Sequence, residues 1–207
     1  MRFVTLLILF LSAQLCFGQA SAPPQVAANT WLLVDYVTGQ PLLEHEADRR
    51  IEPASLTKLM TAYLTFAALK EGRITPEQQV PVSEKAWKMI GSRMFIEPRK
   101  AVTVDQLVQG MIVQSGNDAC VALAELIAGS EEGFVQLMNR EAERLGMKDT
   151  RYMNTTGLPH PEHLTTARDL SILASAIIRD FPEYYPTYSQ KEFTYNDIRQ
   201  PNRNRLL

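Results

Sequence analysis

Cysteine and histidine are scarce in this chain, and so are the sites that they build. Among 207 residues there are two cysteines, Cys16 and Cys120, and three histidines. None of them lies in a cluster with the spacing of metal ligands, so we expect neither a metal nor another cofactor. The G-x-S-x-G segment that carries the serine of an α/β-hydrolase is absent as well. These absences argue against a metalloenzyme and against that class of serine hydrolase.

The chain also lacks an excess of charge of either sign. Lysine and arginine number 21 against 23 aspartate and glutamate, which gives a formal charge of -2. Without a basic excess, nucleic acid is not an expected partner. Repeats and low-complexity segments are missing, and the 45% hydrophobic content is that of one ordinary globular domain.

The first 20 residues differ in kind from the rest. Arg2 is the only charged residue before Asp35, and a mostly apolar run follows it up to small residues near Ala20. This order is typical of a signal peptide, residues 1–20, that is cleaved after Ala20. An amphipathic helix or a short membrane anchor is the alternative, although the run falls short of the roughly 20 apolar residues that span a bilayer. Residues 21–30, rich in alanine and proline, are then the N-terminal arm of the mature chain.

Cleavage of this leader would remove Cys16 and leave Cys120 without an internal disulfide partner. Cys120 stands in the apolar stretch 119–127, with no histidine nearby. This setting predicts a buried, unreactive thiol rather than a nucleophile.

The hydrophobic pattern predicts an α+β domain with one early hairpin and several helices. The hairpin joins 31–37 to 42–47 through a four-residue turn. The expected helices are bounded by cap residues and cover 55–72, 102–114, 118–128, 130–146 and 166–178. Two strands do not form a stable sheet alone, so the pattern indicates that strands of the sheet are missing.

Candidate chemistry begins with Ser55-Leu56-Thr57-Lys58, at the start of the first helix. Residues at positions i and i+3 share one helix face, so the lysine amine can reach the serine hydroxyl and accept its proton. That role needs a neutral amine, so burial, a helix dipole or a second cation must lower the pKa of Lys58 from about 10.4. The plainer alternative makes Ser55 a helix cap and Lys58 a solvated first-turn residue.

A second group, Ser115-Gly116-Asn117, lies between two predicted helices. Serine, glycine and an amide at a helix junction are also ordinary turn residues. A loop pinned between helices can nevertheless direct these side chains at Lys58. Ser115 is then a candidate for proton relay to a leaving group, and Asn117 for a hydrogen bond to the lysine or to a substrate carbonyl.

Together these groups resemble the S-x-x-K and S-G-N motifs of penicillin-binding proteins. Residues 53–58 (PASLTK) are similar to the nucleophile motif of the low-molecular-mass D-alanyl-D-alanine carboxypeptidases, and 114–120 (QSGNDAC) to their second motif. Further similarity occurs, in family order, at 31–35, 92–95, 167–169 and 202–204. The resemblance implies an incomplete peptidase domain over residues 31–207, with the fold shared by DD-peptidases and β-lactamases.

The resemblance also implies a function. Proteins of that family remove the terminal D-alanine from peptidoglycan stem peptides through an acyl-enzyme, and β-lactam antibiotics acylate the same serine. Ser55 would be the nucleophile, Lys58 its proton acceptor and Ser115 the third catalytic residue, while Gly116 and Asn117 would bind substrate. A periplasmic location follows, with a membrane-surface anchor in full-length relatives.

Five further positions carry weaker expectations. Asp169 matches a family aspartate near the site and is a substrate-binding candidate, but it is equally placed to be a capping acid. His160 and His163 stand in a proline-rich loop and are expected to be solvent-exposed. Arg99 replaces a glycine that is usual in the family, which disfavours a turn. Arg199 is the weakest candidate of all.

The third family motif, K-T-G, does not occur in the sequence, which ends just upstream of its usual place. The resemblance therefore implies that this sequence lacks the lysine that binds the substrate carboxylate and the strand that carries the second oxyanion donor. A serine-type carboxypeptidase is the leading hypothesis, and a non-catalytic fragment or muropeptide-binding pseudoenzyme is the alternative. A β-lactamase is a third possibility, disfavoured because Glu162 is the only acid in the relevant loop and E-x-x-L-N is absent.

Overall fold

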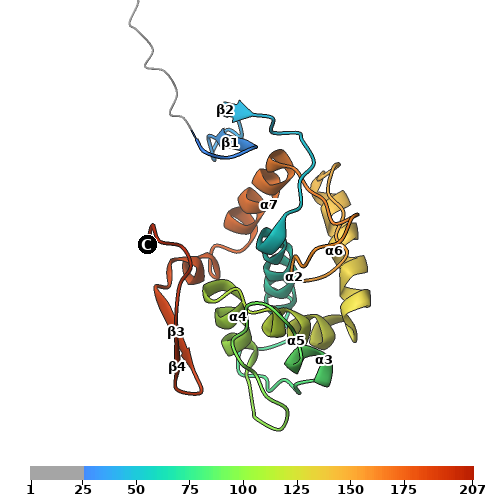
Figure 1. Ribbon diagram of the computed structural model, residues 1–207, viewed down its shortest axis with the longest axis vertical. Helices are drawn as coiled ribbons and strands as arrows, with labels where there is room; N and C mark the ends of the chain where they lie inside the picture. The colour runs from blue at the N-terminus through green and yellow to red at the C-terminus, as the bar shows by residue number, and fades with distance from the viewer. Residues whose placement is uncertain (1–25) are drawn as a thin grey trace, which may run out of the picture.

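The computed structural model describes residues 26–207 and shows a helical body with a short hairpin near each end (Figure 1). The predicted leader, 1–20, and half of the predicted arm lie outside these residues. The α+β class is confirmed. Over the described range no helix is both long and apolar enough to cross a membrane. The helical elements are the 3-10 turn η1 (Ala54–Thr57), α2 (Lys58–Lys70), α3 (Glu84–Trp87), α4 (Val104–Val113), α5 (Asn117–Ala128), α6 (Glu131–Leu145), α7 (Ala167–Asp180) and the 3-10 turn η2 (Tyr185–Ser189), and the strands are β1 (Trp31–Val34), β2 (Pro41–His45), β3 (Glu192–Tyr195) and β4 (Ile198–Pro201).

Helix α5 forms the centre of the core. It packs against α2, α3, α4 and α6, and Figure 1 shows it among them. Its residues from Ala119 to Ala124 are at most 1% exposed, because small side chains let several neighbours approach at once. Cys120 is fully buried there, and burial raises the pKa of its thiol to about 12. The predicted burial of this thiol is confirmed, and its low reactivity stays a prediction.

Capping residues set the helix ends close to their predicted places. Thr103 Oγ1 accepts from the N–H of Gln106, and the Gln106 side chain accepts from the N–H of Thr103, which completes a capping box. Ser130 accepts from the first turn of α6, and Gly146 closes that helix in the left-handed conformation. All five predicted helices are present, with small shifts at their ends. The short helix α3, capped by Ser83, is an addition.

The strands form two separate hairpins. Strands β1 and β2 pair as predicted, but the turn runs from Asp35 to Gln40 and is longer than expected. The prediction of a single hairpin is wrong, because β3 also pairs with β4. Their link, Asn196-Asp197, has positive φ at both residues, as a two-residue type I′ turn requires. The sequence signal for this hairpin is the polar pair Asn196-Asp197 between two short segments in which apolar and polar residues alternate.

Candidate active site

The Ser55–Lys58 turn places a hydroxyl beside an amine. Because η1 is a 3-10 turn, side chains at positions i and i+3 lie directly above one another. Ser55 Oγ is 3.4 Å from Lys58 Nζ. Ser55 is exposed, whereas Lys58 is only 6% exposed. The hydroxyl is therefore open to a substrate while the amine is shielded from water.

Lys58 is held by uncharged acceptors. Its Nζ donates to Asn117 Oδ1 and to the carbonyl of Thr156, both at 2.8 Å. Burial lowers the pKa of Lys58, and the positive charge of Arg203 acts in the same direction. In the neutral amine, two N–H bonds serve these acceptors and the lone pair is left for the Ser55 proton. The alternative of a capping serine and a solvated lysine is wrong, since neither η1 nor α2 has a side-chain cap and Lys58 is buried.

The Ser115-Gly116-Asn117 loop meets this turn from the junction of α4 and α5. Asn117 accepts from Lys58 and donates its Nδ2 to the carbonyl of Ile90 at 2.7 Å. Ser115 has a φ of 63°, which is unusual for serine. Its Oγ is buried and has no hydrogen-bond partner in the described part of the chain. A strained backbone and an unpaired hydroxyl in one residue are typical of a functional position.

Asp118 stabilises the wall behind this loop and is missing from the predicted site. Its carboxylate is 1% exposed and accepts from the N–H groups of Met94, Phe95 and Ile96 at 2.9, 2.8 and 3.1 Å. Three donors satisfy a buried carboxylate without a cation. These bonds fix the 92–96 segment next to Asn117. The sequence signal for Asp118 is its position directly after Ser115-Gly116-Asn117.

The 150–165 loop supports the turn from the other side, and sequence reasoning missed it too. The Thr156 carbonyl holds the lysine amine, and Thr61 Oγ1 donates to the carbonyl of Thr155 at 2.8 Å. Asn154 Oδ1 accepts from the N–H groups of Thr156 and Gly157 at 3.1 and 2.7 Å. The sequence signal is this Asn-Thr-Thr-Gly segment, which forms an Asx turn.

Gly157 allows the loop to touch the segment that carries Ser55. Its φ is 86°, and a Cβ added there would lie 1.8 Å from the Ala54 carbonyl oxygen. Ala54 itself has a φ of 47°, in the left-handed region, directly before Ser55. The exposed Ser55 therefore follows a strained residue that is packed against a glycine, an arrangement found at functional sites.

His163 corrects a prediction. It is 2% exposed rather than solvent-exposed, and its Nε2 lies 2.9 Å from Thr57 Oγ1. Burial, together with the charge of His160, lowers the pKa of His163 to about 4. The side chain faces inward because Arg151 pairs with Leu164 in a short bridge beside it. His160 is only partly exposed.

Two weaker candidates lie apart from the Ser–Lys pair. The Asp169 carboxylate accepts from the N–H of Asp149 at 2.9 Å and from Thr150 Oγ1 at 2.7 Å. No hydrogen bond joins Asp169 to Ser55, Lys58 or the Ser115 loop within residues 26–207. Arg199 forms an exposed ion pair with Glu192 across the β3–β4 hairpin. The structure thus brings together Ser55, Lys58, Ser115 and Asn117, and not these two.

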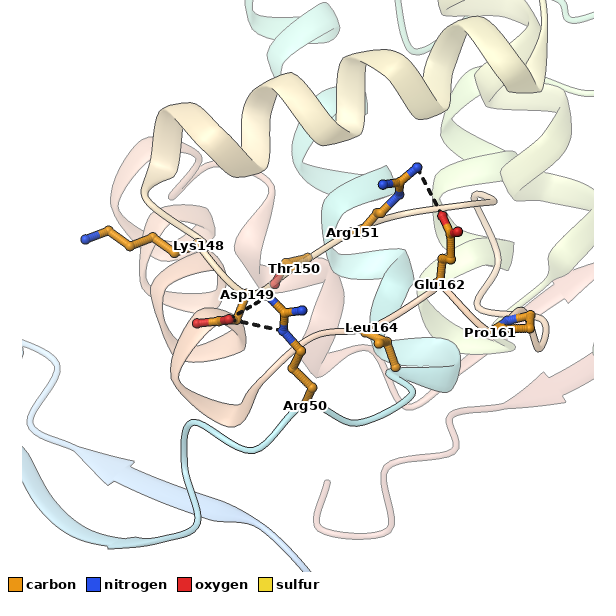
Figure 2. A pocket seen from close by; sticks show the side chains of 8 residues that line it. All are labelled: Arg50, Lys148, Asp149, Thr150, Arg151, Pro161, Glu162 and Leu164. Carbon is orange, nitrogen blue, oxygen red and sulfur yellow. Dashed lines mark hydrogen bonds and ion pairs between the residues drawn. The ribbon is translucent and has the colours of Figure 1, made fainter.

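Two cavities differ in what they can do chemically. One of about 110 Å³ is bordered by Ser55, Leu56, Lys58, Leu59, Met111, Ile112, Ser115 and Tyr188. Figure 2 shows another of about 410 Å³, lined by Arg50, Lys148, Asp149, Thr150, Arg151, Pro161, Glu162 and Leu164. There Arg50 pairs with Asp149 at 2.7 Å, and Arg151 with Glu162 at 3.1 Å. Of these two cavities, only the smaller places a serine hydroxyl beside a buried lysine amine. No cluster of three or more potential metal ligands occurs over residues 26–207.

Known proteins are similar to this chain in sequence. A family model described as D-alanyl-D-alanine carboxypeptidase matches residues 18–207. D-alanyl-D-alanine carboxypeptidase DacC of Escherichia coli (strain K12) is 46% identical over an alignment of 207 positions, which covers 96% of this chain and 52% of the relative. DacA of Haemophilus influenzae is 45% identical over 188 residues, 89% of this chain and 48% of the relative. The chain spans about half the length of the curated relatives that it matches.

Solved structures share the fold. Penicillin binding protein 5 from Haemophilus influenzae matches with a TM-score of 0.87 and 45% identity, covering 89% of this chain and 55% of that one. Penicillin-Binding Protein D2 from Listeria monocytogenes, in its ampicillin-bound form, matches with a TM-score of 0.78 and 27% identity, covering 89% and 76%. The predicted DD-peptidase fold is confirmed. With 190 consecutive residues matched by one family model, the chain belongs to the D-alanyl-D-alanine carboxypeptidase family.

Proposed function

We propose that the full-length protein is a serine-type carboxypeptidase that removes the terminal D-alanine from peptidoglycan stem peptides, and that β-lactams acylate it at Ser55. One observation carries this proposal. The exposed Ser55 hydroxyl lies 3.4 Å from a buried amine that two neutral oxygens hold. A serine hydroxyl attacks an acyl group only when a base takes its proton, and a desolvated lysine is such a base.

In the proposed acylation step, Ser55 Oγ bonds to the carbonyl carbon of the penultimate D-alanine while its proton passes to Lys58. The N–H of Ser55 donates to the oxyanion, a contribution of roughly 3–4 kcal/mol. The carbon–nitrogen bond then breaks, and Ser115 relays the proton to the amine of the departing D-alanine. In the second step water adds to the ester, the Ser55–carbonyl bond breaks, and Ser55 recovers its proton.

The neighbouring residues have supporting roles in this proposal. Asn117 orients the lysine amine, because its Oδ1 accepts from Lys58 while its Nδ2 is anchored on a backbone carbonyl. Gly116 keeps the loop close to the core, since an added Cβ would lie 3.0 Å from Asp118 Oδ1. Asp169 has no role in this step, since its carboxylate accepts from the N–H of Asp149 and from Thr150 Oγ1.

The proposal also includes where in the cell the protein acts. Export by the leader-like residues 1–20 would deliver the protein to the periplasm, where stem peptides are available. The membrane-surface anchor of full-length relatives belongs to the same proposal. The partners are peptidoglycan stem peptides and, as inhibitors, β-lactams.

The test is release of D-alanine from a muramyl pentapeptide by the full-length gene product. We expect release from a D-alanyl-D-alanine terminus, none from a D-alanyl-L-alanine terminus, and a loss of at least about a thousandfold in Ser55→Ala. Absence of release by protein that unfolds cooperatively contradicts the proposal. Fast turnover of a chromogenic β-lactam without D-alanine release would instead favour a β-lactamase.

A further inference from the structure

His163 is a buried polar residue that the proposed mechanism does not use. Its ring lies beneath the first turn of the nucleophile helix, with Nε2 2.9 Å from Thr57 Oγ1. Thr57 is 0% exposed and stands in the chain directly before Lys58. A buried hydrogen bond between two such side chains is costly to lose, because either partner would be left unpaired.

The surroundings of His163 fix its tautomer. The N–H of Met153 points at Nδ1 at 3.4 Å, so Nδ1 carries the lone pair and Nε2 carries the proton. Nε2–H then donates to Thr57 Oγ1. Tyr152 packs edge-on against the imidazole, with ring centroids 5.7 Å apart and planes at 89°. Protonation of Nδ1 would set two donors against each other, consistent with a pKa of about 4.

The backbone around His163 is anchored independently of the active site. Arg151 pairs with Leu164, and Ile51 with Thr165, in short antiparallel bridges. Arg151 and Leu164 face the large cavity in Figure 2, whereas the next residues along, Tyr152 and His163, are buried on the opposite side. The same loop supplies the Thr156 carbonyl to Lys58. His163 thus joins a fixed loop to the turn that carries the nucleophile.

We propose that His163 is a positioning residue for acylation, which through Thr57 fixes the Ser55–Lys58 turn against the loop whose Thr156 carbonyl holds the lysine amine. This inference rests on the proposed function. Without the bond, the turn shifts relative to Thr156, water reaches the amine, and the neutral fraction of Lys58 falls. Displacements of about 1 Å at a reacting centre cost on the order of a hundredfold in rate.

A double-mutant cycle on the full-length gene product tests this role. Thr57→Val and His163→Phe remove the bond from either side, and His163→Gln restores a donor to Thr57. We expect the acylation rate constant with penicillin to fall about 10- to 100-fold in each single variant and no further in the double variant. The penicillin dissociation constant should stay within about twofold, and His163→Gln should recover most of the rate. His160→Phe, from the same loop, is the control and should behave as wild type.

A purely structural role would give a different pattern. The cycle would then show coupling in the free energy of unfolding while the acylation rate constant of folded protein stayed at the wild-type value, and the proposal would be overturned. A second readout does not depend on acylation. In NMR titrations of ¹³C-labelled lysine, the pKa of Lys58 should rise in His163→Phe and stay lowered in His163→Gln. A Lys58 pKa that is equal in all variants also overturns the proposal, whereas wild-type protein without any adduct counts against the proposed function.

Discussion

The cavity beside Ser55 and the larger one in Figure 2 each contain a lysine, and they surround it differently. Lys58 is buried and bonded to an amide oxygen and a backbone carbonyl, neither of them charged. Lys148 is exposed, and the two arginines near it form ion pairs with carboxylates. The smaller cavity buries its lysine away from water, and the larger cavity pairs its two arginines with acids.

This difference shows why neither volume nor positive charge identifies the site. An amine in a dry setting with neutral acceptors has a lowered pKa, as Lys58 does, and the role of base that we propose for Lys58 requires such a shift. Cations that remain hydrated and paired keep their charge, and their ion pairs contribute only about 0–1 kcal/mol. We therefore expect the proposed chemistry at the buried lysine, whose hydrogen-bond acceptors carry no charge.

The largest expected effect comes from exchanging the two lysines for an uncharged residue of similar length. Lys58→Met should lower the rate of penicillin acylation by about 10³- to 10⁴-fold, because the serine loses its base. Lys148→Met should change that rate by less than about twofold. Time courses of fluorescent-penicillin labelling measure both. Labelling of Lys58→Met within tenfold of the wild-type rate would remove the distinction between the two cavities.

A smaller but still large effect is expected from the loop that holds Lys58. Gly157→Ala places a Cβ against the Ala54 carbonyl and should lower acylation by roughly a hundredfold, with a clear loss of stability. Gly72 is the matched control, since its φ of 69° is similar and no atom lies within 4 Å of an added Cβ. Gly72→Ala should cost only about 1–2 kcal/mol of backbone strain and leave acylation unchanged. Equal acylation rates in the two variants would show that the contact is unimportant.

Acid should lower the free energy of unfolding of the chain through the buried His163. The pKa of this histidine is about 4 in the folded chain and about 6.5 in an unfolded one. Between these values the unfolded state binds the extra proton, so the free energy of unfolding should rise as pH increases from 4 to 6.5 and then level off. The gain is at most about 3 kcal/mol. Urea unfolding across this range measures it, and His163→Gln should flatten the rise. Identical pH dependence in both proteins would contradict a buried neutral imidazole.

The smallest expected effect lies far from either cavity, at Arg99. The turn that its substitution for glycine was expected to disfavour does form, with Arg99 exposed at a φ of 69°. Because a non-glycine residue is strained there, Arg99→Gly should raise the free energy of unfolding by about 1 kcal/mol. Acylation should not change. Denaturant unfolding provides the measurement, and a loss of stability would show that the arginine side chain makes a compensating contact.

The structural features that could be predicted from the sequence follow from patterns among neighbouring residues. Helices with caps at Thr103, Ser130 and Thr166 follow from residues within one turn of each other. The proximity of Ser55 and Lys58 follows from the i to i+3 spacing in the same way. Even the burial of Cys120 could be inferred from its apolar neighbours.

The remaining site residues depend on contacts that no local pattern encodes. Lys58 meets the Thr156 carbonyl across 98 positions, and Thr57 meets His163 across 106. A proline-rich loop suggests exposure. The antiparallel bridges of Arg151 with Leu164 and of Ile51 with Thr165 instead fix this segment with the His163 side chain on its buried side. Asp169, conversely, matches a family position, but its carboxylate accepts hydrogen bonds from Asp149 and Thr150. Tertiary packing, not motif spacing, decides these cases.

Mass mapping of a penicillin adduct on the full-length gene product tests the central claim most directly. We expect one adduct per chain, on the peptide that contains Ser55, and none in Ser55→Ala after the same brief exposure. Protein that unfolds cooperatively but carries no adduct, or carries it on another residue such as Ser115, would contradict the assignment of the Ser55–Lys58 turn as the acylating site.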